Sequence, residues 1–99
     1  MAIVTYDQLA AQVGLTDDAP EQDQTALQQK ADAAQNHIER LLGYRIVDQF
    51  PDETPPALVE AVLQLAAWWF ENREAASESD RVLPFGVAEI VNEYREWSF

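Results

Sequence analysis

The chain has 99 residues, of which eighteen are acidic and six are lysine or arginine, so its formal net charge is −12. This length suits one compact domain, expected over residues 1–99, and the 47% of apolar residues is normal for a folded protein. The absence of cysteine excludes disulfides, thiolate metal sites and cysteine nucleophiles, while the acidic surface argues against sequence-specific binding of DNA or RNA.

The first two predicted helices have clear boundaries. Thr5 and Gln8 have the spacing of a capping box at the start of a short helix, and Gly14 is placed to end that helix in the left-handed conformation. A second helix is predicted over residues 21–42, where Gly43 stops it. Its apolar face, with alternating steps of four and three residues, consists of Leu27, Ala31, Ala34, Ile38 and Leu41.

The second half of the chain predicts two more helices after a short connection. Residues 44–50 contain the β-branched Ile46 and Val47 and are predicted to form an extended arm. Pro55 or Pro56 opens a third helix that reaches about Glu74, and a fourth begins near residue 85. The predicted fold is therefore all-α, a small four-helix domain with a short extended arm between the second and third helices. The longest apolar stretch, residues 61–70, is too short to cross a bilayer, so no membrane association is expected.

The third predicted helix is apolar on too many sides for a single contact. At about 100° per residue, its apolar side chains cover about 260° of the circumference. The polar stripe that remains consists of Glu60, Gln64 and Glu71. Two alternatives are open: the other three helices of the chain wrap this helix, or another subunit covers part of it.

The end of this helix supplies the candidate subunit-interface residues. The aromatic side chains there each carry about 150–250 Å² of surface to bury. Arg73 projects to an apolar side of the helix and is expected to pair with a carboxylate outside its own helix; alternatively, it stabilises the helix dipole from the last turn. The candidate interface residues are Trp68, Trp69, Phe70, Arg73 and Glu74.

The C-terminus ends on two aromatic residues, Trp97 and Phe99, where chain ends are usually polar and mobile. Trp97 continues the apolar stripe of the fourth helix, so it either packs in the core or docks onto a partner. Phe99 follows the expected helix end, and one buried aromatic can dominate an interface. Both are candidate partner-docking residues.

The sequence offers no catalytic arrangement. The single histidine, His37, lies at the edge of the apolar face of the second helix, where a structural role is expected, and the three glycines are too scattered to cradle a phosphate. No histidine pair or acidic loop has the spacing of a zinc or calcium site. We therefore expect no enzyme activity, no cofactor and no metal.

Four short motifs occur in order within residues 56–95. They are Pro-Ala-Leu-Val-Glu-Ala-Val-Leu at 56–63, Trp-Phe-Glu-Asn-Arg-Glu-Ala at 69–75, Leu-Pro-Phe-Gly-Val at 83–87 and Tyr-Arg at 94–95. Their order and spacing resemble the head–tail connector (DNA-packaging adaptor) family of long-tailed phages and prophages. The N-terminal half resembles the family more loosely, with a capped short helix, an acidic loop and a long helix that ends Leu-Leu-Gly-Tyr at 41–44.

The resemblance implies a structural adaptor, a head completion protein. Its subunits would form a ring of about a dozen copies, a closed cyclic assembly. The expected partners are the portal protein above the ring and a tail-side connector or stopper protein below it. The genome would pass through the centre without specific binding. The implied location is the head–tail junction of the virion, after assembly in the host cytoplasm.

The charge leaves a second function open. An acidic surface either only solubilises the protein or lets DNA pass without adhesion. The alternative function is a monomeric acidic DNA mimic that inhibits a host nucleic-acid-binding protein. Such a mimic shares the small size and the charge, but not the pattern of residues 56–95. It would stay monomeric or dimeric, whereas a connector forms large rings.

Overall fold

Helices form the regular secondary structure of the residues that the computed structural model describes, which are 3–16, 18–71 and 85–95. In chain order they are α1 (Tyr6–Val13), α2 (Glu21–Leu42), α3 (Ile46–Gln49), α4 (Pro56–Glu71) and α6 (Phe85–Tyr94). No strand occurs within these ranges, so the all-α class is confirmed. None of the described helices is both long and apolar enough to pass through a membrane.

The ends of α1 and α2 follow from local sequence chemistry. The Thr5 hydroxyl accepts a hydrogen bond from the Gln8 backbone N–H at 3.1 Å, and the Thr5 N–H donates to Gln8 Oε1 at 2.8 Å. Gly14 ends α1 with a φ of 78°, and Gly43 ends α2 with a φ of 91°. Only glycine adopts this left-handed conformation without steric cost, so both predicted helix stops are confirmed. The two hydrogen bonds between Thr5 and Gln8 confirm the predicted capping box.

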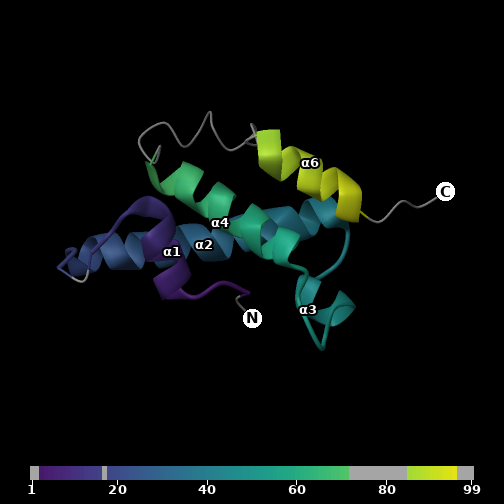
Figure 1. The fold of residues 1–99 in the computed structure, drawn as a ribbon, viewed down its shortest axis with the longest axis horizontal. Coiled ribbons are helices and arrows are strands. Elements are labelled where there is room, and N and C mark those ends of the chain that lie inside the picture. Colours follow the sequence, from purple (N-terminus) through teal and green to yellow (C-terminus); the bar gives the residue numbers. More distant parts are fainter. Residues whose placement is uncertain (1–2, 17, 72–84, 96–99) are drawn as a thin grey trace.

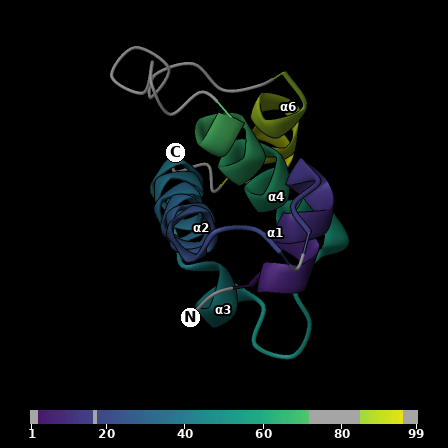
Figure 2. The same cartoon turned by 90° about the vertical axis from the view of Figure 1, so that its left-hand side faces the viewer.

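Helix α4 lies at the centre of the described structure and contacts α1, α2 and α6 (Figures 1 and 2). Seen along the long axis in Figure 2, α2 lies to the left of α4, while α6 and α1 lie towards its right. Other helices of the same chain therefore cover most of the apolar circumference of α4. This arrangement is the first of the two alternatives that the sequence left open.

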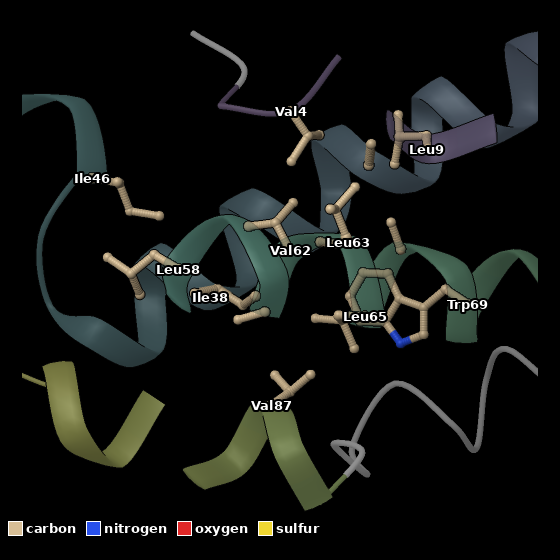
Figure 3. Packing of buried hydrophobic residues seen from close by; sticks show 14 of the residues in the cluster. Val4, Leu9, Ile38, Ile46, Leu58, Val62, Leu63, Leu65, Trp69 and Val87 are labelled. Atoms are coloured by element: carbon tan, nitrogen blue, oxygen red, sulfur yellow. The ribbon is translucent and has the colours of Figure 1, made fainter. Parts of the chain in front are cut away.

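The hydrophobic core forms where these helices meet. Figure 3 shows Val87 of α6 pointing towards α4, and Val4 and Leu9 entering the core from the N-terminal segment. That segment is held by the Ile3 N–H, which donates to Oε1 of the buried Gln35 on α2 at 2.9 Å. The largest fully buried side chains are Leu27, Ile38, Leu42, Ile46, Leu58, Leu65, Val62 and Val87.

The prediction of an extended arm at residues 44–50 was wrong, because residues Ile46–Gln49 form the helical turn α3. The Ile46 N–H donates to Glu39 Oε2 on α2 at 2.8 Å, and the Phe50 N–H donates to the Ile46 carbonyl at 2.9 Å. The Ile46 side chain is fully buried. A cap supplied by another helix and burial of one side chain outweigh the extended preference of β-branched residues.

An aromatic cluster joins the segment after α2 to the end of α6. Tyr44 and Phe50 meet edge to face with ring centroids 6.2 Å apart, and Phe50 and Tyr94 do so at 6.3 Å. The Tyr44 hydroxyl donates to the Tyr94 backbone carbonyl at 2.7 Å, which satisfies a carbonyl in the last turn of α6. The contacts fix the end of α6 against the segment that leads to α4.

Replacing Tyr44→Phe tests this connection. The change keeps the ring and removes the hydrogen bond to the Tyr94 carbonyl, so the free energy of unfolding in urea should fall by about 0.5–1.5 kcal/mol. The matched control is Tyr6→Phe, because the buried Tyr6 hydroxyl has no hydrogen-bond partner among the described residues. That variant should be neutral or up to about 1 kcal/mol more stable. Equal losses of unfolding free energy in both variants would show that the hydrogen bond from Tyr44 to the Tyr94 carbonyl does not stabilise the fold.

Candidate assembly surfaces

The aromatic residues at the end of α4 differ sharply in exposure. Among the described residues, Trp68 is the large hydrophobic residue that is exposed, with 40% of its surface accessible to solvent. Trp69 and Phe70 are only 8% and 7% exposed and belong to the core. Among the large hydrophobic residues that the structure describes, Trp68 therefore has the most surface to offer to a partner.

Trp68 adjoins the polar stripe of α4. We call Glu60, Gln64, Trp68 and Glu71 the α4 stripe. Gln64 Nε2 donates a hydrogen bond to Glu60 Oε1 at 3.0 Å. The side chains of Glu60 and Glu71 are both exposed. Helix α6 begins beside the stripe, since a Cβ atom on Gly86 would lie 2.9 Å from Gln64 Oε1. A glycine here lets α6 approach α4 closely beside Gln64, which is half-buried.

A second surface lies on α2, along the side next to Trp69. It is an open groove of about 620 Å³ whose lining combines basic and apolar side chains. A neighbouring hollow of about 570 Å³ continues it past Gly43 to Arg45. We call the first hollow the α2 groove; it is lined by Lys30, Ala33, Asn36, His37, Arg40, Leu41 and Trp69.

The charges of the α2 groove are available for an external partner. No ion pair of Lys30, Arg40 or Arg45 occurs within residues 3–16, 18–71 and 85–95. His37 packs against Trp69 with ring centroids 5.5 Å apart and the planes tilted by 59°. The lining of the groove therefore combines cations with aromatic side chains in a chain whose net charge is −12.

The structure places only some of the predicted interface residues. Trp68, Trp69 and Phe70 follow one another on α4, but they face different surroundings, as their exposure shows. Arg73, Glu74, Trp97 and Phe99 lie outside the described residues.

The α2 groove was not predicted from the sequence. Its signal was the spacing of Lys30, His37 and Arg40, at steps of seven and three residues, in a chain with few bases. This spacing puts the three side chains on one flank of a helix.

The described residues hold no group of three histidine or acidic side chains that could bind a metal ion. The hollows on α2 are shallow and open, and they bring no nucleophile next to a base. What the two surfaces can do is make contact: one is basic with aromatic side chains in its lining, and the other is acidic with an exposed tryptophan.

Comparison with known proteins identifies a family. The family described as "Phage gp6-like head-tail connector protein" matches residues 4–95, which is nearly the whole chain. No curated protein and no solved structure matches the chain. The family match confirms the resemblance found in the motifs of residues 56–95.

The different surroundings of Trp68 and Phe70 predict different effects of the same substitution. Trp68→Glu should keep the helical circular dichroism and a cooperative unfolding transition, because the side chain is already 40% exposed. Phe70→Glu would bury a charge at a cost of several kcal/mol, a large part of the roughly 5–15 kcal/mol that stabilises a typical small domain. It should therefore unfold the chain or abolish the cooperative transition. Unfolding of both variants would show that Trp68 belongs to the core.

Proposed function

Because the chain belongs to the family of phage gp6-like head–tail connector proteins, we propose that it is a structural adaptor that forms a ring beneath the portal. In this proposal about a dozen copies close into a ring that links the head to a tail-side connector or stopper protein. The packaged genome passes through the ring without specific binding. The protein acts by assembly at the head–tail junction of the virion, and it carries out no catalysis.

The family match over residues 4–95 carries the proposal, and the chemistry of the chain supports it. A ring subunit needs two surfaces for its two neighbours, and the described residues offer a basic groove and an acidic stripe with an exposed tryptophan. A conduit for DNA should not attract phosphate, which agrees with a net charge of −12. An acidic DNA mimic would share this charge, but that function does not account for the family match.

The portal provides the most direct test of the proposed function. The purified chain should be mixed with isolated portal rings of the same phage, and the mass of the complex measured across a concentration series. We expect about a dozen chains on each portal ring, because a closed ring on a cyclic template uses every equivalent site. A chain that never binds the portal and instead binds a basic host protein as a monomer or dimer would contradict the proposal.

The C-terminal residues 96–99 should contribute to docking. We propose that Trp97 and Phe99 insert into the portal or seat against the neighbouring subunit. A chain that ends at Arg95 keeps every described residue of the core, so it should fold with near-normal stability but fail to join portal-bearing heads. Thermal unfolding and a head-completion assay measure the two effects. Normal head completion would show that the tail is dispensable, and failure to fold would place Trp97 in the core.

A further inference from the structure

The α2 groove and the α4 stripe lie on different sides of the molecule. At about 100° per residue, Glu60 and Gln64 project about 140–180° away from Trp69, which lines the α2 groove and packs against His37. Figure 2 shows α2 on one side of α4, with α6 and α1 towards the other. Two unlike surfaces on different sides of a subunit are what a head-to-tail contact between copies requires.

The two surfaces also match in length and charge. Lys30 and Arg40 are separated by about 15 Å along α2, at a rise of about 1.5 Å per residue. By the same rise, Glu60 and Glu71 are separated by about 16.5 Å along α4. The two cations have no ion pair within the described residues, and the two carboxylate side chains are exposed. Two pairs of opposite charge can therefore meet at once.

Between these charges the surfaces offer apolar contact. The exposed Trp68 lies between Gln64 and Glu71 in the α4 stripe, and the lining of the α2 groove includes Ala33, Leu41 and Trp69. Tryptophan is a frequent centre of protein interfaces, because a large ring loses much water-exposed area at a small entropic cost.

We propose that the α2 groove of one copy of this chain receives the α4 stripe of the next copy. Trp68 of the incoming copy lies against the lining of the groove, and Lys30 and Arg40 face Glu60 and Glu71. This assignment rests on the proposed ring, because it names the surfaces by which neighbouring subunits meet. The contact is heterologous, so each copy keeps one free groove and one free stripe until the ring closes.

Charge is the reason for choosing a second copy as the occupant. A chain with a net charge of −12 repels its own copies at long range, so self-association needs a local exception. The α2 groove provides it, because it collects Lys30 and Arg40 on one flank. An acidic segment of matching length complements the groove, and the α4 stripe of an identical chain is such a segment.

Two charge-reversal variants and a mixture of them test the proposal. The groove variant is Lys30→Glu with Arg40→Glu, and the stripe variant is Glu60→Lys with Glu71→Arg. Each variant alone juxtaposes like charges and should self-associate at least about tenfold more weakly than the wild type, measured by sedimentation and mass photometry. An equal mixture should regain assembly, because both new interfaces in an alternating ring are again of opposite charge.

A control separates the contact from general repulsion. The stripe variant is less negative than the wild type, so weaker general repulsion alone would strengthen its self-association. Asp48→Lys with Asp52→Arg changes the net charge equally at two exposed positions outside both surfaces. This control should assemble at least as well as the wild type.

Cross-linking detects the contact even when it is weak in the free protein. The chain has no cysteine, so Ala33→Cys in one sample and Gln64→Cys in another supply single reactive thiols in the groove and the stripe. A short bismaleimide should join the two variants in a mixture far more than either variant to itself. A double-cysteine chain should give a ladder of covalent oligomers.

The outcomes distinguish this contact from the proposed function. If wild type and both charge variants load portal rings equally well, the ring stands and the assigned surfaces are wrong. If the 33–64 cross-link forms but the chain never binds a portal, the contact stands and the connector function fails. The contact is wrong if the 33–64 cross-link forms no more than the other cross-links up to the solubility limit, or if the mixture of charge variants does not regain assembly. Either result would also be obtained if the groove binds the portal instead of a second copy.

Discussion

Helix α4 imposes the constraint on which the described fold depends, because it is apolar around most of its circumference. A helix of this kind is stable in water only when neighbours cover it from several directions. Helices α1, α2 and α6 all contact it, and the aromatic cluster of Tyr44, Phe50 and Tyr94 holds the end of α6 in place. The buried residues of α4 thus fix where the other helices lie and which part of α4 is left at the surface.

The part of α4 left at the surface is a narrow strip that contains Trp68. The charges beside Trp68 decide which surface this strip can contact. In a chain with a net charge of −12, most pairs of surfaces repel each other, so the few cations decide where contact is favourable. Helix α2 places two of the six lysine and arginine side chains, Lys30 and Arg40, along one flank, beside the buried Trp69. Packing on α4 and the scarcity of bases together produce two unlike surfaces on one small subunit. An adaptor that closes into a ring needs such a pair.

Local chemistry made much of the fold predictable from the sequence. The hydrogen bonds of Thr5 and Gln8 and the positive φ of Gly14 and Gly43 depend on neighbouring residues, and they occur where the sequence placed them. The turn at Ile46 was predicted wrongly, because its cap comes from the side chain of Glu39 on another helix.

For the surfaces, the sequence could indicate excess apolar area at the end of α4, but not that Trp69 and Phe70 would be buried while Trp68 stayed exposed. This difference in exposure depends on where α1, α2 and α6 pack against α4. The same packing places Trp69 beside the basic flank of α2. A cryo-electron microscopy structure of the chain bound to the portal ring would show directly which surfaces of neighbouring copies meet. We expect a closed ring in which α2 of each copy lies against α4 of the next. A ring in which the α2 groove faces solvent, or a portal without a ring, would contradict it.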